Sequence, residues 1–173
     1  HLTTVGASSN DSVREIYVGS LDAFPTAAFP LVDYIALGHI HQPQKVGGLE
    51  HIRYSGSPIA LSFDEVRQSK QMLLVDLGPE GLQAVTPLPV PCFQPMASVA
   101  GSLTALPDLM RAAAQAGSPA RPVWLEVVVE QDDYLLQLTD RVQALADELP
   151  VELLRVRRQR GRAVAGMAAA AGE

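Results

Sequence analysis

Four prolines lie close together near the middle of the sequence, at positions 87, 89, 91 and 95. Because proline fixes φ and removes a backbone donor, this stretch favours extended chain and suits a linker or an edge segment. A chain of 173 residues is long enough for one sizeable domain or two small ones. We therefore place a domain boundary here and expect units at residues 1–91 and 92–160, followed by a disordered Ala- and Gly-rich tail at 161–173.

The second of these units alternates between strand and helix patterns. Apolar residues at helical spacing predict two helices, and short apolar runs predict three strands around them. In chain order the predicted elements are the strand 96–100, the helix 103–114, the strand 123–129, the helix 133–149 and the strand 151–156. Asp132 or Asp133 could cap the second helix. With right-handed crossovers, this order predicts a small two-layer α/β sandwich.

Residues 1–91 carry short apolar runs that are typical of strands. The predicted strands are 33–37, 51–54, 72–77 and 82–88. A turn at 78–81 joins the last two as a hairpin. Residues 58–63 fit either a short helical turn or a loop.

Composition narrows the class of protein. The formal net charge of -6 argues against a wholly electrostatic nucleic-acid binder, but not against a local basic face. No apolar run approaches the ~20 residues that a membrane helix needs, and no basic-then-apolar leader is present, so we expect a soluble cytoplasmic protein with no membrane partner. Cys92 is the only cysteine, which leaves no internal disulfide and no zinc framework. Since the first residue is His rather than Met, we expect a piece of a longer protein.

The sharpest local motif is Gly38-His39-Ile40-His41, directly after the predicted strand 33–37. Ligand sites in open sheets gather beyond the carboxyl ends of strands. In extended chain, His39 and His41 would point the same way and could reach one metal ion or two adjacent ions. Gly38, which has no Cβ, would let the chain turn sharply and approach an ion closely. The alternative is two polar residues in a surface loop.

Weaker candidates lie elsewhere in the first unit. His1 could be a further metal ligand, or only the residue at which the sequence starts. Ser55 and Ser57 follow the predicted strand 51–54 and could face a phosphate, although Ser57 could equally cap a turn before Pro58. His51 is interpreted as a structural or surface residue.

A cluster of arginines ends the second unit. Five of them within eight residues could neutralise several DNA phosphates, and such contacts would depend strongly on salt. The alternative is a solvated strand end and tail. On the last strand, Arg155 and Arg157 would share one face, so only part of the cluster could act together. The five are Arg155, Arg157, Arg158, Arg160 and Arg162.

These pieces together resemble one family. The resemblance rests on the segments HLTTVGAS, FPLVDYIALGHIHQPQ, IRYSGSPIALSFDE with Lys70 behind it, and LPVELLRVRR. They are similar to segments of the SbcD family, the nuclease subunits of bacterial SbcC–SbcD DNA repair complexes. The similarity covers roughly residues 1–160, in the same order.

The resemblance implies a fold and a metal site. Residues 1–91 would form the C-terminal half of a calcineurin-like two-metal phosphoesterase sandwich, and a small α/β capping domain that helps place DNA would follow. His1, His39 and His41 match metal ligands of the family, with His1 and His39 on one ion and His41 on the other. The implied cofactors are two divalent metal ions, most often Mn²⁺. The remaining ligands and the catalytic His, in Asp-x-His, Gly-Asp and Gly-Asn-His-Asp motifs, are expected upstream of this sequence.

Carboxylates within this sequence add little to such a site. Two dications need negative charge from a bridging carboxylate and oxygen ligands, which imidazoles do not supply. Asp33 and Asp64 are the nearest candidates. Asp33 begins its predicted strand, at the wrong end for the site, and Asp64 could at best contact a ligand.

The implied activity belongs to the full-length protein. It is a 3′-to-5′ double-strand exonuclease and single-strand endonuclease in DNA repair and recombination, and we expect this piece alone to be inactive. We expect the DNA contacts of this piece to come from Ser55, Ser57, Arg155, Arg157 and Arg158. The implied partners are DNA, an SbcC-like ATPase subunit and a second copy in a homodimer. The Ala-rich tail does not resemble the helices with which the family docks on SbcC.

Two other functions stay open on sequence alone. One is a calcineurin-like phosphoesterase that acts on small phosphodiesters, which would share the His motif without needing a capping domain. The other is a non-catalytic binding module built on the strand and helix repeat of residues 92–158.

Overall fold

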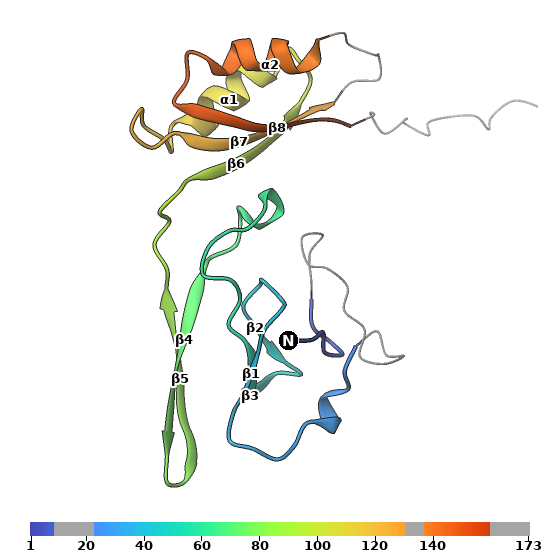
Figure 1. Ribbon diagram of the computed structural model, residues 1–173, viewed down its shortest axis with the longest axis vertical. Helices are drawn as coiled ribbons and strands as arrows, with labels where there is room; N and C mark the ends of the chain where they lie inside the picture. Colours follow the sequence, from blue (N-terminus) through green and yellow to red (C-terminus); the bar gives the residue numbers. More distant parts are fainter. Residues whose placement is uncertain (9–22, 131–136, 160–173) are drawn as a thin grey trace, which may run out of the picture. The chain divides into compact units, whose positions relative to one another are not determined.

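The structure is a computed structural model that describes residues 1–8, 23–130 and 137–159 (Figure 1). The chain divides into two compact units, His1–Phe93 and Gln94–Glu173. The tail expected at 161–173 lies outside the described residues. In the described part of the chain, no helix is long and apolar enough to span a membrane.

A three-stranded sheet forms the centre of the first unit. Its strands are β1 (Ile35–Leu37), β2 (Gln44–Val46) and β3 (Leu49–Tyr54). β3 lies between the other two, parallel to β1 and antiparallel to β2. The sequence predicts β1 and β3 but misses β2, because β2 carries a single apolar residue, Val46. That side chain is fully buried in the core of this unit. The buried apolar core consists of Leu37, Ile40, Val46, Ile52 and Tyr54.

The predicted hairpin is confirmed as β4 (Gln71–Gly78) and β5 (Gly81–Pro89), which pair antiparallel and form a long ribbon (Figure 1). Gly81 has a φ of 93°, which suits the left-handed position of a tight turn. β5 contains Pro87 and Pro89, and within the described residues it pairs with β4 alone. The N–H groups that these prolines lack therefore cost no hydrogen bond to a strand on its other edge. The described part of this unit also contains the 3₁₀ turns η1 (Thr26–Ala28) and η2 (Phe63–Glu65).

The second unit is a parallel sheet with two helices on one face (Figure 1). Its strands are β6 (Met96–Gly101), β7 (Val123–Glu130) and β8 (Val151–Gln159), with β7 in the centre. The helices α1 (Leu106–Ala114) and α2 (Leu138–Ala146) connect them. This is the strand, helix, strand, helix, strand order that the sequence predicts, and it confirms a mixed α/β fold.

The core of the second unit lies between the helices and the sheet. Alternate residues of β7 point into it, so one face of this central strand is fully buried. The buried core residues are Leu106, Met110, Leu125, Val127, Val129, Val142 and Ala146. Since they come from both helices and from the central strand, the second unit has a hydrophobic core of its own.

Both helices begin later than the apolar spacing predicts. α1 begins at Leu106, with Pro107 in its first turn, a position that proline tolerates. α2 begins at Leu138 because Gln137 has a φ of 56°, a left-handed conformation that a helix cannot include. The predicted caps Asp132 and Asp133 lie outside the described residues.

Candidate metal centre and the Glu65 network

His39 and His41 follow β1, as predicted, but their side chains meet different partners. His39 has a φ of 106°, a conformation that is uncommon for a residue with a side chain. The chain is therefore not extended at this point, and the expectation that both imidazoles point the same way is wrong. The ring of His39 lies against that of His1, with centroids 4.9 Å apart. The Nδ1 atom of His41 instead lies 2.7 Å from Oε1 of Glu65.

Tyr54, the last residue of β3, holds the first residues of the chain near His39. Its buried phenol donates a hydrogen bond to the Leu2 carbonyl at 2.7 Å and accepts one from the Thr4 N–H at 3.1 Å. The ring of His1 then lies beside Gly38, where a Cβ would come within 3.3 Å of the His1 Nδ1 atom. Gly38 thus permits the close approach of the His1 imidazole. The sharp turn of the backbone that was expected at Gly38 lies instead at His39.

Glu65, at the end of η2, is fully buried and accepts several hydrogen bonds. Its Oε2 accepts from Lys70 Nζ at 2.6 Å, from the Leu61 N–H at 3.2 Å and from Ser57 Oγ at 3.3 Å. Lys70 also donates to Ser57 Oγ at 2.8 Å. We call His41, Ser57, Glu65 and Lys70 the Glu65 network. A buried carboxylate is tolerated when a cation and hydrogen-bond donors surround it, as they do here.

Sequence reasoning missed Glu65. It named Asp33, which precedes β1 at the end opposite to the histidines, and Asp64, which accepts a hydrogen bond from Ser62. The one available signal was the spacing of Glu65 and Lys70, which allows an ion pair across a single turn. That signal is weak because most such pairs lie on the surface.

Ser55 and Ser57 do not present hydroxyls to solvent, in contrast to the phosphate contact expected of them. Ser57 is 7% exposed and its hydroxyl lies inside the Glu65 network. The Ser55 hydroxyl is also buried, and it has no hydrogen-bond partner within the described residues. The alternative role of Ser57 as a cap before Pro58 is not observed either, since the next helical turn is η2.

Arg155 and Arg157 share one face of β8, as predicted, and both contact Glu126 of β7. Their Nε atoms lie 3.3 and 2.9 Å from Oε1 of Glu126. Glu126 is only 3% exposed, and its Oε2 accepts a hydrogen bond from Ser98 at 2.7 Å. Arg158 is in register with Val129, one position out of step with the other two. Arg160 and Arg162 lie outside the described residues.

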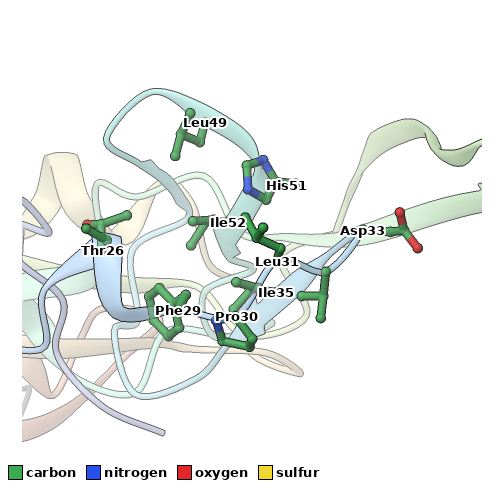
Figure 2. Close-up of a pocket in the computed structure, with 11 residues that line it drawn as sticks. Thr26, Phe29, Pro30, Leu31, Asp33, Ile35, Leu49, His51 and Ile52 are labelled. Atoms are coloured by element: carbon green, nitrogen blue, oxygen red, sulfur yellow. The ribbon is translucent and has the colours of Figure 1, made fainter.

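In the first unit, a pocket of about 470 Å³ lies at the end of β1 opposite to the histidine motif (Figure 2). Phe29, Leu31, Ile35 and Ile52 contribute apolar walls, and His51 lies among them (Figure 2). Ile35, the first residue of β1, is paired with Ile52 of β3, whereas the histidine motif follows the end of β1. The pocket and the histidine motif are therefore separate features of the first unit.

The histidines fit part of a metal centre. Two imidazoles that bind one ion through nitrogens at about 2.1 Å bring their ring centroids to within roughly 5 Å, which agrees with the 4.9 Å between His1 and His39. Imidazole is also a suitable ligand for several divalent transition metals. Within the described ranges, no group of three or more His, Cys, Asp or Glu side chains is arranged to hold an ion. A complete centre would need further ligands.

Comparisons with known proteins match most of the chain. Residues 92–173 match the SbcD_C family model, described as a type 5 capsule protein repressor C-terminal domain. The chain is 52% identical over 163 residues, 92% of its length, to the SbcD subunit of the SbcCD nuclease from Escherichia coli K12. It is 32% identical over 160 residues, 88% of its length, to the SbcD subunit from Rhodobacter capsulatus. The chain spans 40% and 39% of these two relatives.

Proposed function

The chain belongs to the SbcD family of nuclease subunits, and we propose that it forms the C-terminal part of a two-metal DNA nuclease. In this proposal the first unit completes a calcineurin-like phosphoesterase sandwich, and the second unit is a capping domain that contacts DNA. The observation that carries the proposal is the placement of the histidines. The ring of His1 lies against that of His39, which follows β1, while the imidazole of His41 contacts Glu65 instead.

Each histidine has a distinct role in this proposal. His1 and His39 would hold one divalent ion, and His41 would hold the second through Nε2, the nitrogen that does not face Glu65. Two such ions would supply the activation of a water and a clamp on the scissile phosphate, and Mn²⁺ suits a set of nitrogen and carboxylate ligands. Three neutral imidazoles contribute no negative charge. The bridging carboxylate and the other oxygen ligands would come from another part of the full-length protein. That part would correspond to the region of the longer relatives that this chain does not span.

The second unit would contact the DNA backbone through Arg155 and Arg157. Because both share Glu126, the three groups carry a net charge of one rather than two. Their contribution to phosphate binding would therefore be smaller than the arginine count suggests. The assembled enzyme would act in DNA repair as a cytoplasmic homodimer with an SbcC-like ATPase subunit.

The test is manganese-dependent DNA degradation by the full-length protein and by variants of its histidines. His39→Ala and His41→Ala are expected to lower cleavage by more than about 100-fold, because a lost ligand costs at least as much as a lost partner of a ligand. The folded state and DNA binding should survive. The 173-residue chain alone should not cleave DNA, since its described part holds no complete metal-ligand set.

His51 provides the matched control. It is the fourth histidine of the sequence and lies in β3, where it lines the separate pocket. His51→Ala should therefore cleave DNA at close to the wild-type rate. Wild-type cleavage by His39→Ala or His41→Ala, or robust cleavage by the 173-residue chain, would show that the metal site lies elsewhere.

A further inference from the structure

We infer that Glu65 is a positioning residue for His41: it fixes the tautomer and the orientation of the imidazole, so that Nε2 is presented to a metal ion. The inference rests on the proposed function, because it assigns His41 a role in metal binding. Glu65 is not one of the proposed metal ligands, and it lies in η2 rather than in the histidine motif. Three features of the described residues carry it.

The first feature is the direction of the hydrogen bond between the two side chains. The Nδ1 to Oε1 distance of 2.7 Å is typical of a bond to a charged acceptor. Glu65 also accepts from Lys70 Nζ at 2.6 Å, which favours an ionised carboxylate, and an ionised carboxylate can only accept. Nδ1 of His41 must then carry the proton, and in the neutral ring Nε2 keeps the lone pair that binds a metal.

The second feature is that the network holds His41 at two places. Glu65 holds the ring, and the Ser57 N–H donates to the His41 carbonyl at 3.1 Å. Gly56 makes this second contact possible, because it has a φ of 84° and a Cβ there would come within 2.8 Å of the His41 carbonyl oxygen. Lys70 joins the two contacts, since its Nζ donates to both Ser57 Oγ and Glu65 Oε2. The orientation of His41 is therefore fixed from both its backbone and its side chain.

The third feature is the burial of the charges. The side chains of Glu65 and Lys70 are 0% and 9% exposed. Burying a salt bridge is weak evidence for a role in stability, because apolar residues of similar volume often serve as well. A carboxylate that accepts from the far nitrogen of a ligating histidine has a known physical effect, which is to orient the ring and raise its basicity as a ligand. The Glu65 network has the geometry for that effect.

The experiment measures Mn²⁺ binding to the full-length protein by the EPR signal of the free ion. The wild type is expected to bind two ions. In Glu65→Gln, one binding step should weaken by about 10–100-fold, the usual cost of losing a partner of a metal ligand. The other step should change less, because Glu65 accepts a hydrogen bond from His41, whereas the rings of His1 and His39 lie against each other.

Glu50→Gln is the matched control. Glu50 forms ion pairs with Lys45 and Arg53 in the same unit, so the substitution also removes a carboxylate that contacts cations. Neither of these pairs includes a histidine. Both Mn²⁺ binding steps of Glu50→Gln should therefore match those of the wild type.

The outcomes separate the inference from the proposed function. A Glu65→Gln protein that melts at a lower temperature but binds both ions normally would make Glu65 structural only, and would overturn the inference. A wild type that binds no Mn²⁺ would overturn the proposed function itself. If Glu65→Gln does not fold, the inference is tested instead by the tautomer of His41 in the wild-type protein. ¹⁵N NMR at pH 8.5, with the signal assigned by its loss in His41→Gln, should show the proton on Nδ1; a proton on Nε2 would overturn the inference.

Discussion

Removing Arg155 and Arg157 together should destabilise the second unit, because both guanidinium groups contact a carboxylate that is almost fully buried. Glu126 is 3% exposed, and Arg155→Gln/Arg157→Gln would remove both cations that contact it and leave it with neutral donors, the Ser98 hydroxyl and the introduced amides. A buried charge without a cation is costly, since neither water nor a counter-ion reaches it. The expected result is a less stable second unit.

The magnitude follows from the burial of each partner. Breaking a fully buried ion pair costs about 3–5 kcal/mol, but the two arginine side chains are 52% and 51% exposed, so water already screens them. The Ser98 hydrogen bond also remains. We therefore expect a loss of about 2–3 kcal/mol in the free energy of unfolding. In a domain of this size, that corresponds to a fall in Tm of about 10–20 °C.

Trp124 makes the effect measurable. It is the only tryptophan of the sequence, it precedes Glu126 by two positions in β7, and its Nε1 donates to Glu152 of β8 at 2.9 Å. Its fluorescence during urea unfolding should therefore report on the second unit alone.

Two further variants isolate the cause. Adding Glu126→Gln to the double variant should recover most of the lost stability, because no charge is then left unpaired. Arg111→Gln should change little, since its pair with Asp108 is 64% and 86% exposed and such surface pairs contribute about 0–1 kcal/mol. A double variant as stable as the wild type, or a triple variant as unstable as the double, would refute the reasoning.

Two other outcomes are expected of the second unit. Residues 94–159 should fold without the first unit, since their core is complete, and hydrogen exchange should find slowly exchanging amides in β7; rapid exchange throughout β7 would contradict this. If the arginines contact DNA, replacing Glu126, Arg155 and Arg157 together by Gln should flatten the slope of log K against log salt by about 0.9, the value for one phosphate contact. An unchanged slope in a filter-binding titration would show that Arg155 and Arg157 do not contact DNA phosphates and have a structural role.

The sequence predicts the second unit well because its signals are local. Apolar residues at helical and strand spacing mark α1, β6 and β7 without reference to distant parts of the chain. The exact start of α2 was missed because the left-handed conformation of Gln137 follows from no residue preference. The predicted shared face of Arg155 and Arg157 was confirmed, but its buried partner Glu126 was not expected. A glutamate that alternates with apolar residues in a strand is more commonly exposed.

The first unit shows where sequence reasoning fails. β2 forms because β3 offers it an edge, and nothing within its three residues would predict a strand. The positive φ of His39 also follows from no local signal, since residues with a side chain seldom adopt it. Glu65 is buried only because η2 brings it to Lys70 and Ser57. The failures at His39 and Glu65 concern residues whose partners, His1 and His41, are distant in sequence, whereas β2 pairs with the next strand along the chain.

The contacts of the three histidines suggest how the proposed metal centre divides its tasks. Tyr54 places His1 beside His39 through hydrogen bonds to Leu2 and Thr4, and Glu65 places His41. The described chain can therefore orient the neutral nitrogen ligands with its own residues. Glu65, the carboxylate that contacts His41, is already paired with Lys70, so it brings little net negative charge to a pair of dications. In the proposed enzyme, this chain would set the geometry of the nitrogen ligands, while the charge that balances the ions would come from the other part of the protein.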